Sequence, residues 1–183
     1  MQEHHELITL HAGKYLTLVA QGHWEFATRT TARPGVAIVA LTDDDRVILV
    51  RQHRIPVGRS VIELPAGLVG DTPDAKDEEL LVAAQRELLE ETGYTARDWT
   101  ELIRGLSSPG LSDESIVFYL AEGLEKVAEG GGDESEAITV YEVPRHDVLA
   151  WVTERKDAVS IMLFAGLHAA EVRLRTRSRQ GTS

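Results

Sequence analysis

Carboxylate side chains gather in one segment of the sequence, residues 78–94, which reads EELLVAAQRELLEETGY. We predict that this segment forms one helix, which Gly93 ends. Glu87, Glu90 and Glu91 stand at i, i+3 and i+4 and therefore fall on one face of that helix. Like charges at these spacings repel by about 0.2–0.5 kcal/mol per pair, so stability alone does not explain them. A divalent cation would turn the repulsion into a binding site.

The composition limits the classes of function. A chain of 183 residues is long enough for one domain with a real core. Its formal net charge of −11 is opposite to what a nucleic-acid backbone binder needs, and the four arginines within residues 173–179 do not amount to a nucleic-acid module. The absence of cysteine excludes disulfides and thiolate metal sites. We therefore expect a cytoplasmic protein without nucleic-acid partners.

The N-terminal residues show no signal peptide, and no apolar run reaches the 18 residues of a membrane span, so no membrane partner is expected either.

A series of short strands and turns is predicted before the acidic helix. They comprise strands at 15–19 and 24–28, a buried strand at 36–41, a hairpin through the turn at 42–45 into a strand at 46–51, a strand at 61–64, and a loop at 70–77.

Beyond the acidic helix the pattern changes from strands to helices. A short segment at 101–104 and a loop at 107–114 precede a core strand at 116–121, a glycine- and acid-rich loop at 128–137 and a strand at 138–143. Apolar residues then recur at helical spacing over 145–155 and 158–173, so two helices are predicted, with a disordered tail from 173 to 183. The chain is thus expected to be α+β.

Residues 86–94, RELLEETGY, resemble the second half of the Nudix box, REUxEExGU, in which U is aliphatic or aromatic. Glu78 stands eight residues before Arg86, as the earlier glutamate of the box does, and Gly67 resembles its opening glycine. The gap from that glycine to that glutamate is ten residues, 68–77, instead of five, which indicates a five-residue insertion in a loop.

The resemblance implies a Nudix fold, an α/β/α sandwich around a mixed β-sheet with a small N-terminal β subdomain. The expected organisation is a subdomain at 1–32, a Nudix domain at 33–175 and a disordered end at 176–183. The subdomain would be exchanged between the subunits of a homodimer.

The same resemblance implies a metal site for Mg²⁺ or Mn²⁺. Its ligands would be Glu87, Glu90, Glu91 and the backbone carbonyl of Ala66, oxygen donors of the kind that magnesium prefers. Arg86 would hold a carboxylate in place, with Glu78 and Glu90 as possible partners. Arg86 and Glu90 therefore belong to the expected catalytic machinery.

Segments outside the box resemble the ADP-ribose (ADP-sugar) pyrophosphatase branch of the family. They include residues 51–58, RQHRIPVG, residues 62–67, IELPAG, and Pro109 beyond the box. In this branch Trp24 would stack on adenine, or else lie in a core or dimer interface. The arginines Arg29, Arg54 and Arg51 would lie near the base or the diphosphate, or else only add surface charge.

Three further acidic positions follow from the resemblance. Glu63 would reach the metals or the ribose, or make a structural hydrogen bond. Glu114 would touch metal or substrate, or cap a loop. The catalytic base is expected in the loop at 128–137, with Glu136 first and Glu134 second, although a flexible acidic surface loop is the alternative.

The expected reaction is metal-dependent hydrolysis of ADP-ribose, or of a related nucleoside diphosphate sugar, to AMP and ribose 5-phosphate. The alternatives are another nucleotide substrate, such as a dinucleotide polyphosphate or an oxidised nucleotide, or an ADP-ribose sensor without turnover. In the exchanged homodimer, Trp24 and Arg29 would complete the site of the partner.

Overall fold

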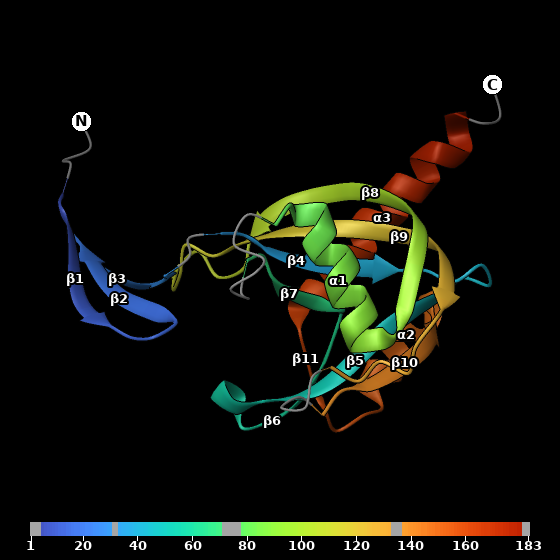
Figure 1. Ribbon diagram of the computed structural model, residues 1–183, viewed down its shortest axis with the longest axis horizontal. Helices are drawn as coiled ribbons and strands as arrows, with labels where there is room; N and C mark the ends of the chain where they lie inside the picture. Colours follow the sequence, from blue (N-terminus) through green and yellow to red (C-terminus); the bar gives the residue numbers. More distant parts are fainter. Residues whose placement is uncertain (1–4, 31–32, 71–77, 133–136, 181–183) are drawn as a thin grey trace.

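The computed structural model describes residues 5–30, 33–70, 78–132 and 137–180. Within these residues the chain forms two four-stranded sheets and one three-stranded sheet, with strand orders β7-β4-β9-β8, β10-β5-β6-β11 and β1-β2-β3 (Figure 1). Residues 71–77, most of the stretch 68–77 in which the five-residue insertion was expected, lie outside the described residues, as do the two loop glutamates Glu134 and Glu136.

The first sheet is built around β4 (Gly35–Ala40), which is buried throughout. It pairs antiparallel with β7 (Ala66–Leu68) and parallel with β9 (Ser115–Lys126), and β9 pairs antiparallel with the long strand β8 (Tyr94–Leu106). A strand with apolar residues on both faces needs neighbours and cover on all sides, which this central position provides.

The second sheet is built around β5 (Arg46–Arg54), which pairs antiparallel with β6 (Arg59–Glu63) and β10 (Thr139–Pro144). The short strand β11 (Ala158–Val159) runs parallel to β6. The predicted hairpin between residues 36–41 and 46–51 is therefore wrong, because β4 and β5 belong to different sheets and share only the bridge Leu41–Val47 in the described chain. Both strands are continuous apolar runs, and their pattern does not reveal the sheet to which each belongs.

Helices cover the strands from two sides. Helix α1 (Leu80–Thr92) packs Ala83, Ala84 and Leu88 into one core with β4 residues such as Ile38. Helices α2 (Val148–Thr153) and α3 (Ile161–Gln180) contribute to a second core that includes Leu49. Figure 1 shows α1 in front of the strands and α2 and α3 behind them. The expected α/β/α arrangement is confirmed.

The C-terminal tail corrects a second expectation. Residues 173–180 continue α3 as helix, whereas disorder was predicted from 173 onward. Arg177 donates two hydrogen bonds of 2.7 and 2.8 Å to Glu122 on β9, and Arg175 pairs with Glu171 one turn earlier. Because arginine occupies every second position here, the sequence shows no helical apolar pattern and the helix was not predicted. These ion pairs stabilise it. The helix predicted at 145–155 is a 3-10 turn, η3 (Arg145–Asp147), followed by α2.

The N-terminal sheet projects from the rest of the molecule (Figure 1). Its strands β1 (Leu7–Ala12), β2 (Leu16–Gln21) and β3 (Trp24–Arg29) form an antiparallel meander.

In the second sheet, a short 3-10 turn, η1 (Ile55–Val57), separates β5 from β6. No helix in the described parts of the chain is both long and apolar enough to cross a membrane.

Candidate active site

The acidic helix presents its carboxylates in two different environments. Glu87 and Glu91 lie one turn apart on the inner side of α1 and are only 7% and 4% exposed. Glu90 lies between them in sequence, but its side chain is 53% exposed. The helix prediction is confirmed over residues 80–92, and Gly93 ends the helix in the left-handed conformation with φ of 73°. Buried carboxylates are costly unless a cation or hydrogen bonds compensate them.

Strand β7 packs directly against these carboxylates. A Cβ atom at Gly67 would lie 1.9 Å from the carboxyl carbon of Glu87, so any other residue here would push the Glu87 carboxylate out of its present position. The backbone N–H of Ala66 donates a 3.1 Å hydrogen bond to Oε2 of Glu91. The structure thus brings Ala66 to Glu91 through its N–H, and the ligand role of its carbonyl stays a prediction.

Arg86 contacts both of its expected partners and one more carboxylate. Its guanidinium donates to Glu78 at 3.0 and 3.2 Å, to Glu90 at 3.0 Å and to Glu87 at 2.9 Å. It also reaches the carbonyl oxygen of Leu68 at 3.2 Å, which joins α1 to the end of β7. The hydrogen bond from Arg86 holds the pKa of Glu78 below its usual range, and the same contact raises the pKa of Arg86.

Arg33 is a site-adjacent residue that the sequence reasoning missed. Its guanidinium donates to the backbone carbonyl of Glu78, and its charge adds to the lowering of the Glu78 pKa. The two residues are 45 positions apart. No local spacing signals such a contact, although Arg33 directly precedes the Pro34-Gly35 break in the sequence.

The carboxylates on α1 fit a hard divalent cation. Three carboxylates share the single guanidinium of Arg86, and Glu87 and Glu91 point toward the strand with which α1 packs. Among the described residues, no three acidic or histidine side chains converge closely enough to hold an ion by themselves. A cation here would therefore take its remaining oxygens from backbone, water or substrate, as magnesium commonly does.

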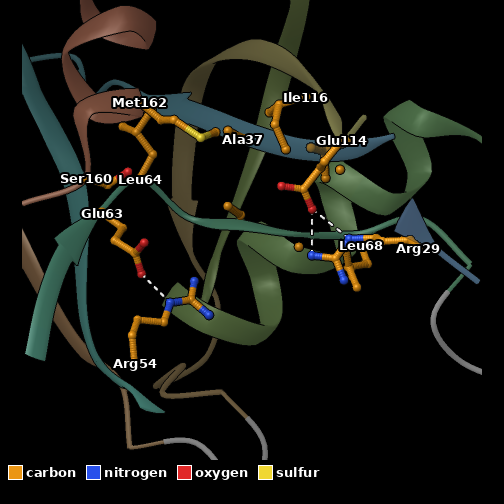
Figure 2. A pocket seen from close by; sticks show the side chains of 14 residues that line it. Arg29, Ala37, Arg54, Glu63, Leu64, Leu68, Glu114, Ile116, Ser160 and Met162 are labelled. Atoms are coloured by element: carbon orange, nitrogen blue, oxygen red, sulfur yellow. Dashed lines mark hydrogen bonds and ion pairs between the residues drawn. The ribbon is translucent and has the colours of Figure 1, made fainter. Parts of the chain in front are cut away.

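A cavity of about 440 Å³ opens beside β7, with Ala66 and Gly67 in its wall. This volume is within the range of small-molecule sites. Two ion pairs line it (Figure 2). Arg54 donates to Glu63 at 2.7 Å, and Arg29 donates to Glu114 at 2.6 Å. Two cationic groups in one cavity suit an anionic ligand.

Each of the two cavity carboxylates therefore has an arginine partner. Glu63 accepts from Arg54, which agrees with the structural hydrogen bond that was one of its two interpretations. Glu114 accepts from Arg29 and from the hydroxyl of Ser107 at 2.8 Å. Ser107 was not among the expected residues. Its contact with Glu114 depends on how the loop at 107–114 folds, which the sequence does not show.

Arg51 lies away from this cavity. Its guanidinium donates to Asp157 at 2.8 Å, and the hydrogen bond holds the pKa of Asp157 below its usual range. Arg51 and Arg54 are three residues apart on β5, and successive side chains of a strand point to opposite faces. The expectation that both arginines face the phosphates therefore does not agree with the structure.

A set of contacts, which we call the β3 seam, joins residues 27–29 to residues 111–114. The N–H of Ala27 donates to the carbonyl of Leu111 at 2.9 Å, Thr28 donates to Asp113 at 2.8 Å, and Arg29 pairs with Glu114. Arg29 thereby enters the cavity of its own chain, whereas the exchanged dimer was expected to deliver it to the partner.

Trp24 lies in a separate hollow of about 350 Å³ at the outer end of this seam. Its neighbours there include Phe26, Leu106 and Pro109, and the indole is 55% exposed. The structure therefore brings Trp24, which was expected to stack on the base, together with Pro109, but not into the cavity that holds Arg54.

Comparison with known proteins identifies the family. The NUDIX domain model matches residues 31–163. An ADP-ribose pyrophosphatase of Bacillus subtilis (strain 168) is 42% identical over 125 residues, and a methanol dehydrogenase activator of Bacillus methanolicus is 38% identical over 125 residues. Each match covers 67% of this chain and 65% of the relative, so the chain spans about 65% of the length of these relatives.

A solved structure supports the same fold. The crystal structure of an ADP compounds hydrolase superposes with a TM-score of 0.75 at 24% identity, covering 95% of this chain and 94% of the other. The family match and the buried glutamates against Gly67 agree with each other: the chain belongs to the Nudix family.

Proposed function

We propose that this protein hydrolyses the diphosphate bond of ADP-ribose, or of a related nucleoside diphosphate sugar, in a metal-dependent reaction. The products would be AMP and ribose 5-phosphate. One observation carries the proposal: buried Glu87 and Glu91 face the β7 strand that walls a cavity lined by Arg29 and Arg54. The relative named ADP-ribose pyrophosphatase supports the choice of substrate.

Glu87, Glu91, Glu90 and the carbonyl of Ala66 are the residues that would hold Mg²⁺ or Mn²⁺. Bound there, the cation would neutralise diphosphate charge and lower the pKa of a water molecule. Arg86 keeps Glu87 and Glu90 oriented through hydrogen bonds of 2.9 and 3.0 Å. Residues that orient metal ligands in this way contribute to metal affinity.

Arg54 and Arg29 would bind the diphosphate through charge-assisted hydrogen bonds. Their partners Glu63 and Glu114 each engage the guanidinium from one side and so fix its direction. Trp24 would stack on the base at the outer end of the β3 seam. Arg51 is left out of this set, because its guanidinium is held by Asp157.

The proton of the attacking water would pass to a loop glutamate. We assign this role to Glu136 and, second, to Glu134, on the family resemblance alone. Water oxygen would bond to phosphorus, the P–O bond to the leaving phosphate would break, and the carboxylate would take the proton.

A homodimer is part of the proposal. A three-stranded sheet has little core of its own, and this one exposes large apolar side chains, among them Leu7, Ile8 and Tyr15. A second copy would cover them. The N-terminal sheet would pack against the partner subunit, while Arg29 stays in the cavity of its own chain and is not exchanged as expected. The Nudix domain would extend beyond 175, since α3 reaches Gln180. The cytoplasmic location also stays a prediction.

Incubation with ADP-ribose and Mg²⁺, with chromatographic detection of AMP, tests the function. We expect AMP to form with Mg²⁺ or Mn²⁺ and not after chelation by EDTA. A panel of ADP-sugars, GDP-sugars and dinucleotide polyphosphates, ranked by kcat/KM, tests the substrate class. Tight calorimetric binding of ADP-ribose without any product would replace the enzyme with a sensor. Sedimentation as a monomer would contradict the proposed homodimer.

A further inference from the structure

The last turn of α1 carries Glu90 and Glu91, and its backbone is unusually well capped. The last four carbonyl groups of a helix have no partner within the helix. Here the carbonyl of Leu89 accepts from the N–H of Gly93 at 2.8 Å, that of Glu90 from Gly132 at 3.0 Å, and that of Glu91 from Gly131 at 2.9 Å. Thr92 completes the set, because its carbonyl accepts from the ammonium group of Lys126 at 2.8 Å.

The donors to the Glu90 and Glu91 carbonyls belong to a loop about 40 residues further along the chain. The backbone conformation of this loop favours glycine. Gly130, Gly131 and Gly132 all have positive φ, at 73°, 113° and 78°. A Cβ atom at Gly130 would lie 2.3 Å from the carbonyl carbon of Thr92, so the loop backbone touches the helix backbone directly. Positive φ and close approach together require glycine.

Lys126 ties this loop to the strands around it. Its ammonium group also reaches the carbonyl of Glu129 at 3.3 Å and lies 4.7 Å above the ring of Tyr94. Tyr94 in turn donates its hydroxyl proton to Glu142 on β10. Burial and this hydrogen bond raise the pKa of Tyr94 to about 12, so the hydroxyl stays a donor at neutral pH.

We propose that Lys126 and the segment 130–132 are positioning residues that hold the last turn of α1, and with it the carboxylate of Glu91, against β7. The claim rests on the proposed metal-dependent function. Helix ends fray when their carbonyls have no partners other than water, and a frayed last turn would move Glu90 and Glu91 relative to Ala66. Four capped carbonyls fix the ligands before the metal arrives, which is the role of a supporting shell.

A pair of glycine variants separates this role from plain backbone strain. Gly130→Ala adds a methyl group that meets the helix, whereas Gly58 has a similar φ of 63° and open space around its missing Cβ. Gly58→Ala therefore carries the strain without the collision. Mn²⁺ affinity would be measured by electron paramagnetic resonance titration without nucleotide, alongside the melting temperature and kcat.

We expect Gly130→Ala to weaken Mn²⁺ binding by about tenfold or more, the size of effect seen for residues that orient metal ligands. Gly58→Ala should lower the melting temperature and leave Mn²⁺ affinity unchanged. Lys126→Met should weaken Mn²⁺ binding in the same direction, and Lys126→Arg should restore it, because a guanidinium can also donate to the Thr92 carbonyl. These two variants carry the test if Gly130→Ala does not fold.

Equal Mn²⁺ affinity in wild type and in the folded Gly130→Ala and Lys126→Met variants would overturn the positioning role. A wild-type chain that binds Mn²⁺ but releases no AMP from ADP-ribose would overturn the proposed function only, because the affinity comparison does not depend on turnover. A wild-type chain that binds no Mn²⁺ would overturn both.

Discussion

The α1–β7 wall, in which Glu87 and Glu91 of α1 pack against Ala66 and Gly67 at the edge of the cavity, differs from the β3 seam in the contacts that hold it together. The wall is buried and tight: a Cβ at Gly67 would collide with the carboxyl group of Glu87, and Glu87 and Glu91 are only 7% and 4% exposed. The seam is more open, and its side-chain contacts join residues 85 positions apart. In the proposed reaction, the wall would carry the groups for chemistry, and the seam would carry groups that select and hold the ligand. A rigid centre beside an adaptable edge allows one reaction to serve different substrates.

The largest effect is expected at the wall. Glu91→Gln removes a buried charge that would bind the metal, so AMP release from ADP-ribose should fall by about 100-fold or more. The melting temperature should change little, because the amide is isosteric. Glu79→Gln, at the exposed start of α1, is the matched control and should retain activity. Loss of activity in both variants, or in neither, would show that the wall is not the catalytic centre.

The two arginines of β5 give the next largest effect. Arg54→Ala should raise KM for ADP-ribose by about 10- to 100-fold, because a hydrogen bond to a charged group contributes about 1.5–3 kcal/mol. Arg51→Ala should leave KM unchanged and lower only the stability, through loss of the Asp157 ion pair. Steady-state kinetics with thermal unfolding separates the two results. An equal rise in KM for both variants would return Arg51 to the substrate site.

Lowering the pH should reduce the free energy of unfolding, because it protonates Glu78 and weakens its ion pair with Arg86. Its pKa is lowered in the folded protein by Arg86, so its contribution to stability is complete above the pKa of the unfolded carboxyl, about 4.3, and disappears as pH falls through the lower folded value. Urea unfolding at pH 7 and pH 3 should therefore show a smaller free energy of unfolding at pH 3. In Glu78→Gln this part of the pH dependence should vanish. A pH dependence identical to that of wild type would contradict the assignment.

The smallest effect is expected at the seam. Thr28→Val removes the hydroxyl that donates to Asp113, an exposed hydrogen bond worth about 0.5–1.5 kcal/mol or less. KM for ADP-ribose should rise about two- to threefold with kcat unchanged, since Arg29 would be less firmly placed. Hydrogen exchange should quicken at the amide of Ala27, which bonds to Leu111. A fall in kcat as large as that of Glu91→Gln would remove the distinction between wall and seam.

The helix side of the wall was predictable from sequence because its information is local, whereas Ala66 and Gly67 on the β7 side were expected only from the family resemblance. Spacing places Glu87 and Glu91 one turn apart, and Arg86 reaches Glu78 and Glu90 within the same short segment. Arg33, Ser107 and the pairing of Arg29 with Glu114 depend on how distant segments meet, which no spacing reports. The β4–β5 hairpin was wrong for a related reason, because apolar runs indicate burial and not partners.

The alternation of β5 has a practical consequence for protein engineering. Leu49 packs in the core to which α2 and α3 contribute, and Arg51 pairs with Asp157 between those helices. Ile48 packs in the α1 core, and Arg54 lines the cavity. Both faces of β5 support the core at residues 47–50, which are fully buried, and the faces differ in role only at the outer end: Arg51 holds an ion pair and Arg54 would hold a ligand. A combinatorial library confined to positions 51 and 54 should therefore change stability through the first and substrate preference through the second, while the buried residues of β5 in both cores are kept.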